Sequence, residues 1–270
     1  MSFPQPIGVF DSGIGGLTVV AALRAALPAE RIFYLGDTAR VPYGGKSAQT
    51  VERYSLEIGQ YLLDHGAKAI VVACNTASAL AVPRLERAFN VPIVGVIIPG
   101  ARAAVRATRN GRIGVIGTRA TISSRAYEHA IKALLPSAKI IGHACPVLVP
   151  LIEEGWLNDK ITDQAIERYL RPLLDAGIDT LVLGCTHYPL LREAIAKIAG
   201  PEVVIVDSAQ NCASAVDELL SENDLAAKNG HNGALHVAFT DQSSGFLPVA
   251  ERALGLRVGG IQIVSLPERK

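Results

Sequence analysis

The 270-residue sequence lacks an excess of charge and a long apolar run, and each absence excludes a class of protein. The formal net charge is +1 and the charges are scattered. The sequence therefore has no basic stripe of the kind that binds nucleic acid or an anionic membrane surface. No apolar run reaches the roughly 18 residues of a membrane span, and the first residues show no basic and apolar leader. We therefore expect a cytoplasmic protein whose partner is a small molecule, not nucleic acid and not a membrane.

The sequence also lacks closely spaced cysteines. Cys74, Cys145, Cys185 and Cys212 show no CxxC spacing, which argues against a disulfide framework and a zinc finger. No cluster of metal ligands is evident, so we predict reduced thiols and no metal. Two of the four, Cys74 and Cys185, share a setting, because each follows an apolar β-like run and precedes a helical pattern.

This shared setting belongs to a wider internal duplication. Ile7-Gly8-Val9 recurs as Ile113-Gly114-Val115, and the 91–94 segment recurs at 203–206. The copies lie roughly 110 residues apart, which exceeds a solenoid period and indicates duplicated domains. A pseudo-twofold axis between the halves would turn Cys74 and Cys185 toward one cleft. The alternative is two ordinary buried cysteines, since free cysteine is among the most buried residue types.

Short apolar runs alternate with helical patterns along the chain, as is typical of parallel α/β proteins. Strands are expected at 7–10, 32–35, 69–73, 93–97, 113–116, 140–143, 180–183, 203–206, 235–239 and 261–266. Helices are expected over the 51–62 pattern and near 121–135, 162–176, 189–199, 209–222 and 246–254, and an exposed loop is expected at 223–232. With 49% hydrophobic residues, the chain has ample material for buried sheets.

The last two expected strands cannot easily enclose a core of their own. We expect them to return to the first half, which makes that domain discontinuous. The predicted first domain therefore comprises residues 1–98 and 208–270, and the second comprises residues 99–207.

Polar residues follow the expected strands in both halves. Ligands of open parallel sheets bind outside the carboxyl ends of the strands, so these positions are the candidate site. Helix capping could explain many of them singly, but it does not explain two cysteines. The positions are Asp11, Ser12, Asp37, Thr38, Cys74, Asn75, Thr76, Gly117, Thr118, Cys145, Cys185, Thr186 and His187.

Two glycine-rich segments fall short of nucleotide-binding motifs. Thr18 replaces the last glycine of a dinucleotide fingerprint that begins at Gly13, and Arg40 stands where a P-loop would need its first glycine. The turn at Gly13–Gly16 can still bring backbone amides close to an anion, and we expect that anion to be a substrate carboxylate.

Four ordered motifs resemble those of the cofactor-independent glutamate racemase family, and the resemblance covers nearly the whole chain. The motifs are PheAspSerGlyIleGlyGlyLeuThrVal at 10–19, ProTyrGly at 42–44, AlaCysAsnThrAlaSerAla at 73–79 and GlyCysThrHisTyrPro at 184–189. The resemblance implies two α/β/α domains with mainly parallel sheets, related by a pseudo-twofold axis, with the substrate between them and no cofactor. The chain departs from the family at Ile98, where many relatives have glutamate.

Two thiols suit this chemistry, because inverting a stereocentre requires a base on one face of the α-carbon and an acid on the other. Helix N-termini are expected to lower the pKa of both thiols. By resemblance, Cys74 deprotonates the D-enantiomer and Cys185 the L-enantiomer. The assisting residues would be Asp11 on the first side and Glu153 and His187 on the second. The resemblance implies substrate contacts from Asp11, Ser12, Tyr43, Gly44, Asn75, Thr76, Thr118, Thr121, Thr186 and His187.

Several assignments stay open at this point. His187 could be a surface or capping residue, Glu154 could replace Glu153, and Asp37 could support Cys74 or cap a helix. Cys145 and Cys212 lack a matching motif, and we predict structural roles for both.

Three functions are weighed. One is a glutamate racemase that supplies D-glutamate for peptidoglycan. A second is a related two-cysteine racemase or isomerase acting on aspartate, hydantoin or maleate. The third, a Cys185–His187 hydrolase or a small-molecule sensor, leaves the symmetric Cys74 without a use. The sequence leaves the oligomeric state open, a homodimer included.

Overall fold

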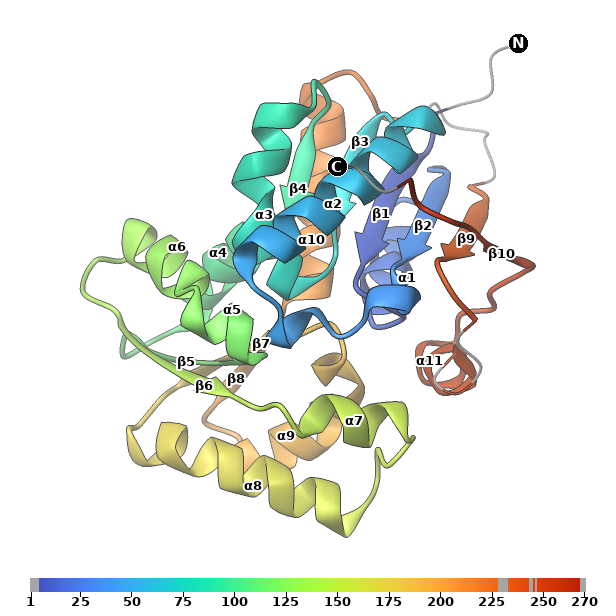
Figure 1. Cartoon of the computed structure of the whole chain (residues 1–270). Coiled ribbons are helices and arrows are strands. Elements are labelled where there is room, and N and C mark those ends of the chain that lie inside the picture. Colours follow the sequence, from blue (N-terminus) through green and yellow to red (C-terminus); the bar gives the residue numbers. More distant parts are fainter. Residues whose placement is uncertain (1–4, 228–232, 243–244, 246, 268–270) are drawn as a thin grey trace.

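The computed structural model describes residues 5–227, 233–242, 245 and 247–267, and these residues form two parallel sheets (Figure 1). The larger sheet has the order β10-β9-β2-β1-β3-β4, and the smaller has the order β6-β5-β7-β8. The larger sheet comprises β1 (Ile7–Asp11), β2 (Ile32–Gly36), β3 (Ala69–Val72), β4 (Ile93–Gly95), β9 (Leu235–Phe239) and β10 (Ile261–Ile263). The smaller comprises β5 (Arg112–Gly117), β6 (Lys139–Ala144), β7 (Thr180–Gly184) and β8 (Val204–Asp207).

The internal duplication is visible in the strand order. β2-β1-β3-β4 and β6-β5-β7-β8 repeat one arrangement, in which the first strand of each half lies between the second and the third. Every strand pairing is parallel, so all strands of one sheet end at the same edge. The predicted α/β class with parallel sheets is confirmed.

Helices cover both faces of each sheet. In the larger sheet, α1 (Leu17–Ala26) and α10 (Ser208–Glu222) lie on one face, and α2 (Ala48–Asp64) and α3 (Asn75–Ala88) lie on the other. In the smaller sheet, α4 (Ile97–Ala107) and α6 (Ala126–Leu134) lie on one face, and α8 (Lys160–Asp175) and α9 (Arg192–Ala199) on the other. The remaining helices are α5 (Arg119–Ser123), α7 (Leu148–Glu153), α11 (Leu247–Leu254), and the short 3-10 helices η1 (Thr38–Arg40), η2 (Tyr43–Gly45) and η3 (Tyr188–Leu191).

The alternation of side chains along a strand explains this two-sided covering. Val9 and Val71 pack toward α1 and α10, whereas their neighbours Phe10 and Val72 pack toward α2 and α3. All four side chains are fully buried. A strand buried on both faces therefore has apolar residues at consecutive positions, and each such side chain contributes roughly 1.5–3 kcal/mol to folding.

Three predicted elements need correction. The apolar run at 93–97 continues past the strand, because β4 ends at Gly95 and the buried Ile97 already begins α4. The helix predicted at 121–135 is two helices, α5 and α6. Arg125 lies between them with a φ of 55°, which interrupts the helical conformation. The last strand, predicted to reach 266, ends at Ile263. Residues 228–232 of the predicted loop and residue 246 of the last predicted helix lie outside the described residues.

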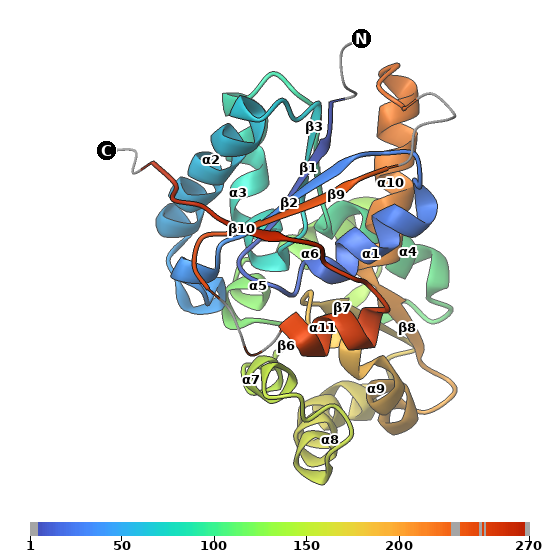
Figure 2. The ribbon, with the colours of Figure 1, turned by 90° about the vertical axis from the view of Figure 1, so that its right-hand side faces the viewer.

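The last part of the described chain lies in the larger sheet. β9 pairs with β2, and β10 pairs with β9. Figure 2 shows α11 between this sheet and α7, below β10. The exact domain boundaries, 1–98 and 208–270 against 99–207, stay a prediction. Within the described residues, the helices are all too short or too polar to cross a bilayer.

Candidate active site

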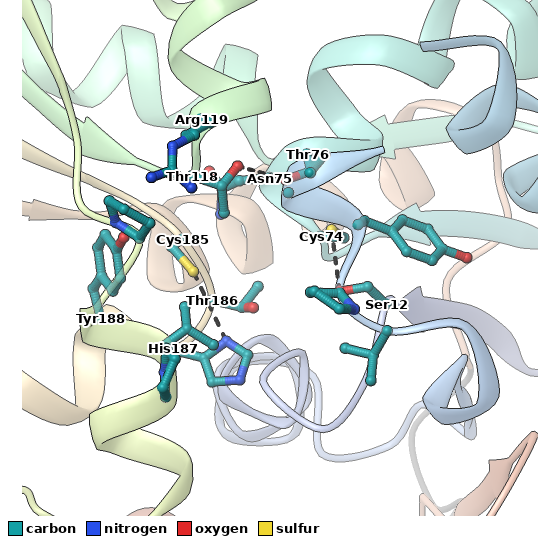
Figure 3. Close-up of a pocket in the computed structure, with 18 of the residues that line it drawn as sticks. Ser12, Cys74, Asn75, Thr76, Thr118, Arg119, Cys185, Thr186, His187 and Tyr188 are labelled. Carbon is teal, nitrogen blue, oxygen red and sulfur yellow. Dashed lines mark hydrogen bonds between the residues drawn. The ribbon is translucent and has the colours of Figure 1, made fainter. Parts of the chain in front are cut away.

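A cavity of about 310 Å³ opens between the carboxyl ends of the two sheets (Figure 3). In a parallel sheet the residues that follow the strands lie at one edge, and in both sheets this edge faces the cavity. Ser12 follows β1, Cys74 follows β3, Thr118 follows β5 and Cys185 follows β7. The structure brings most of the predicted site residues together in the lining. They are Ser12, Tyr43, Gly44, Cys74, Asn75, Thr76, Thr118, Glu153, Cys185, Thr186 and His187.

Cys74 is held at the N-terminus of α3. Its sulfur accepts a hydrogen bond from the Ala77 amide at 3.5 Å, and its thiol donates to Ser12 Oγ at 3.6 Å. Burial, followed by the nearby Asp11 carboxylate, raises the pKa of Cys74 to about 12. The sequence predicted the opposite direction from the helix N-terminus, but removal of this thiol from water outweighs the helix dipole. In this structure Cys74 is therefore a protonated thiol at neutral pH.

Cys185 lies on the opposite side of the cavity and is paired with a histidine. Its sulfur is 3.8 Å from His187 Nδ1, and His187 Nε2 is 3.1 Å from Glu153 Oε1. Burial lowers the pKa of His187, but the hydrogen bonds with Cys185 and Glu153 outweigh it and raise that pKa to about 10. His187 is therefore an imidazolium at neutral pH, and its ring lies beside the Cys185 sulfur.

The structure shows where the residues left open by the sequence lie on the Cys185 side. His187 is 5% exposed and contacts the sulfur, so it is not a surface residue, and it makes no side-chain cap at η3. Glu153, the last residue of α7, reaches His187 and the cavity, whereas Glu154 is exposed and does not line it.

Asp11 lies behind the cavity wall. The last residue of β1, it is fully buried and does not line the cavity. Its carboxylate accepts hydrogen bonds from the amides of Gly13 and Gly16 at 3.1 and 3.0 Å. Two amides of the glycine turn are thus taken up by Asp11, and the substrate carboxylate expected at this turn stays a prediction. Burial raises the pKa of Asp11, and these amide bonds oppose that rise.

Three threonine hydroxyls join the two halves beside the cavity. Thr76 Oγ1 is 2.9 Å from Thr118 Oγ1 and 3.2 Å from Thr121 Oγ1, and the last two are 3.0 Å apart. Thr121 itself does not line the cavity and instead supports Thr76 and Thr118 from behind. The sequence implied that Thr121 contacts substrate, and its place is one layer further out.

Asn75 is oriented by a residue that the sequence analysis missed. Its Oδ1 accepts a hydrogen bond from the Tyr127 hydroxyl at 2.7 Å. Its Nδ2 is buried and has no hydrogen-bond partner among the described residues. A buried amide nitrogen without a partner is costly, and a carboxylate in the cavity would satisfy it. Nothing in the sequence indicates Tyr127, because it lies in α6 of the other half and meets Asn75 only through packing.

Asp37 supports Tyr43 instead of Cys74. The Tyr43 hydroxyl donates to Asp37, which also accepts from Arg40 Nε at 2.7 Å and from Thr240 Oγ1 at 2.9 Å. Asp37 makes no side-chain cap at η1, so neither role considered from the sequence is seen. Burial and the Asp37 charge raise the pKa of Tyr43 well above its usual range, which keeps it a neutral donor.

The lining also contains residues that sequence analysis did not select. Arg119 is exposed and adds a positive charge at the cavity rim (Figure 3). It follows Thr118 directly, so the strand-end rule could have found it. The other additional lining residues are mostly apolar: Val41, Pro42, Gly45, Pro146, Val149, Pro150 and Tyr188.

The remaining cysteines lie outside the lining. Cys145 and Cys212 are fully buried, and burial raises the pKa of each to about 12. Cys145 donates to the His143 carbonyl at 3.6 Å. Across the described residues, no group of three or more His, Cys, Asp or Glu side chains could hold a metal ion.

The arrangement places the Cys74 thiol and the Cys185–His187 pair on opposite walls of one cavity (Figure 3). A base on one wall can remove a proton from a bound carbon acid while an acid on the other returns one to the opposite face. Such a pair can invert a stereocentre without an intervening cofactor.

Known proteins with the same architecture have been described. The family model for Asp/Glu/hydantoin racemases matches residues 15–216. A glutamate racemase from Geobacter metallireducens is 50% identical over 266 residues, which cover 98% of each chain. A crystal structure of a glutamate racemase isoform from Bacillus anthracis superposes with a TM-score of 0.93 at 41% identity, covering 98% of this chain and 99% of that one. A Francisella tularensis glutamate racemase in complex with D-glutamate gives a TM-score of 0.91 at 38% identity, with the same coverage.

Proposed function

The chain belongs to the Asp/Glu/hydantoin racemase family, and from this premise we propose that it is a glutamate racemase that uses Cys74 and Cys185 as its two acid–base groups. The observation that carries the proposal is that both thiols line one cavity from opposite sides. A hydrolase would need only the Cys185–His187 pair and would leave Cys74 unexplained.

In this proposal each thiol acts on one enantiomer. Cys185, beside the His187 imidazolium, removes the α-proton from the L-enantiomer, and the Cys74 thiol donates its proton to the opposite face. Turnover leaves Cys185 protonated and Cys74 ionised, which is the form that acts on D-glutamate. A proton exchanged with solvent restores the resting form.

The carbanion between these steps must be stabilised by the site itself. In this proposal Asn75 Nδ2, which has no partner among the described residues, donates to the substrate α-carboxylate together with backbone amides of the cavity wall, and each such donor is typically worth roughly 3 kcal/mol in the transition state. We assign Ser12, Tyr43, Gly44, Thr76, Thr118 and Thr186 to substrate contacts and Asp11 to electrostatic support from behind the wall.

Glutamate is preferred over aspartate in this proposal. Relatives that are 46–50% identical to this chain are glutamate racemases. Aspartate is shorter, so the groups that donate hydrogen bonds to the side-chain carboxylate of glutamate would stay unpaired, at a cost of roughly 1–3 kcal/mol for each buried group. Arg119 adds a charge at the rim that favours a substrate with two carboxylates.

The deciding experiment incubates the purified chain separately with each enantiomer of glutamate and aspartate and follows the products by chiral chromatography. The samples contain a chelator and no pyridoxal phosphate. Rapid racemisation of glutamate in both directions, with aspartate turned over far more slowly, supports the proposal. Comparable kcat/KM for aspartate would favour the related two-cysteine enzymes.

In the cell, the proposed role is to supply D-glutamate for peptidoglycan in the cytoplasm. Expression in a bacterium that requires D-glutamate should restore growth without supplement, whereas a Cys185→Ala chain should not. Sedimentation of the purified chain tests whether it forms a homodimer, the oligomeric state that the sequence left open.

A further inference from the structure

The turn at Gly13–Gly16 and the start of α1, in the first half, contact the Cys185–His187 segment of the second half. Thr18, in the first turn of α1, donates from Oγ1 to the Gly15 carbonyl at 2.9 Å and to the Thr186 carbonyl at 3.1 Å. Thr18 and Thr186 are each 5% exposed. The hydrogen bond to Thr186 therefore joins the two halves in a water-poor environment, where a direct hydrogen bond is strengthened.

Gly15 packs against the same segment. A Cβ atom at Gly15 would lie 2.6 Å from both Nδ1 and Cε1 of His187 and 2.6 Å from Thr186 Oγ1. These distances are shorter than any van der Waals contact, so only a residue without a side chain allows the His187 ring to take its present place. The turn thus holds Thr186 by a hydrogen bond and limits His187 by direct packing.

Thr186 stands between the two residues that form the acid–base pair. Fixing its carbonyl fixes the backbone on which Cys185 and His187 are carried. The contact between the Cys185 sulfur and His187 Nδ1 is 3.8 Å, already long for a hydrogen bond, so a small displacement would weaken it. Neither Thr18 nor Gly15 lines the cavity, and neither can touch the substrate.

We propose that Thr18 and Gly15 are positioning residues that hold Cys185 and His187 in register from the opposite half of the molecule. The proposal rests on the assignment of Cys185 as an acid–base group. The turn directly follows Ser12 of the cavity wall, so one segment joins the wall of the first half to the acid–base pair of the second.

The test measures each thiol separately by alkylation. Thr18→Val removes the hydroxyl and keeps the shape, and Thr18→Ser restores the hydroxyl. Iodoacetamide labelling as a function of pH, with Cys74 and Cys185 peptides quantified by mass spectrometry, requires no turnover. Thr18→Val should lower the Cys185 labelling curve, because the sulfur loses its place beside His187, and leave the Cys74 curve in place, and Thr18→Ser should restore the Cys185 curve. kcat should fall on the order of tenfold with a smaller change in KM, since misplacement by less than 1 Å is costly.

Matched controls separate positioning from general packing. Thr162→Val removes a hydroxyl that donates to the Trp156 carbonyl at 2.7 Å in α8, away from the cavity, and should leave both labelling curves unchanged. Gly15→Ala should shift the Cys185 curve in the direction of Thr18→Val. Gly13→Ala adds the same methyl group in the same turn, where its nearest neighbour is 3.6 Å away, and should leave the Cys185 curve in place.

Three outcomes would overturn the proposal. The first is that Thr18→Val changes the labelling curves of Cys74 and Cys185 equally. The second is that Thr162→Val changes the Cys185 labelling curve as much as Thr18→Val does. The third is that Thr18→Ser fails to restore the Cys185 labelling curve. If Thr18→Val does not fold, as judged by circular dichroism, the comparison of Gly15→Ala with Gly13→Ala decides. Racemisation by the unaltered chain tests the proposed function independently, so failure of one is distinguishable from failure of the other.

Discussion

The two cysteines differ more in their surroundings than their matching sequence positions suggest. Cys74 is beside Ser12 and near Asp11, which favours the neutral thiol, whereas Cys185 is beside the His187 imidazolium. The two thiols thus have different neighbours, a hydroxyl and a carboxylate beside Cys74 and a cation beside Cys185.

Removal of either thiol should abolish racemisation in both directions. Cys74→Ala and Cys185→Ala each delete one of the two groups that every turnover uses, so both rates should fall by roughly 100-fold or more. Chiral chromatography from each pure enantiomer measures the loss, and circular dichroism establishes that the variants fold. Cys145→Ala and Cys212→Ala, outside the lining, should stay active. Substantial turnover by either alanine variant of the pair would refute the two-thiol assignment.

The raised pKa of Cys74 predicts how this thiol reacts with iodoacetamide. The thiolate is the nucleophile, and the pKa of Cys74 is raised to about 12, so Cys74 stays protonated and unreactive at pH 7 to 9. Its labelling, measured by mass spectrometry, should rise as pH climbs through 10 and 11 without levelling off. A Cys74 labelling curve that levels off below pH 9 would contradict this protonation state.

Glu153 should affect kcat/KM only through its contact with His187. Glu153→Gln removes the negative charge 3.1 Å from Nε2, which lowers the pKa of His187 from about 10. The imidazolium is present below that pKa and lost above it, so the alkaline limb of kcat/KM for L-glutamate should move to lower pH. We expect a loss of about tenfold near pH 9 and a smaller one at pH 7. Glu154→Gln, on the exposed neighbour, is the matched control, and equal effects of the two changes would count against the assignment.

At the scale of elements, the sequence predicted what depends on local pattern. Every expected strand is present, because buried parallel strands have short apolar runs that end at polar or glycine residues. The predicted boundaries of elements were wrong where that pattern is ambiguous. Val96 and Ile97 are as apolar as a strand but belong to the start of α4, and Arg125 gives no sign in sequence that its φ is 55°.

Helix ends away from the cavity should affect stability without affecting chemistry. Asp159 caps α8, where its Oδ1 accepts from the Ile161 amide at 2.7 Å. Asp159→Ala should lower the free energy of unfolding by about 1 kcal/mol while kcat and KM stay unchanged. Urea denaturation and the chiral assay measure the two quantities. Glu167→Ala, exposed on the same helix, should change neither, and a matching loss of stability there would show that capping is not the cause.

For the whole molecule, the sequence predicted the duplication and the meeting of Cys74 with Cys185, since both follow from strand order. It could not predict contacts made between the halves. The Tyr127 hydroxyl on Asn75, the Thr18 hydroxyl on the Thr186 carbonyl and the Asp11 charge near His187 join residues far apart in sequence. The role of Asp37, left open by the sequence, could not be found from it for the same reason, because Thr240 and Tyr43 reach Asp37 only in the folded chain.

The facing of the two halves makes a prediction about where solvent hydrogen enters the product. During early turnover of L-glutamate in deuterium oxide, Cys185 keeps the proton that it removes, and Cys74 delivers a solvent-derived deuteron to the other face. D-glutamate should therefore carry α-deuterium while recovered L-glutamate carries almost none, as measured by mass spectrometry after chiral separation.

The reaction from D-glutamate should give the mirror result, with Cys74 as the abstracting base. A single base that moved between faces would return original protium to the product, and a carbanion that exchanged freely with solvent would label both pools. Cys74 lies at the start of α3 and Cys185 directly after β7, so the proposal gives each thiol one wall of the cavity. Deuterium confined to product in both directions is the result that this arrangement predicts, and either alternative pattern would refute it.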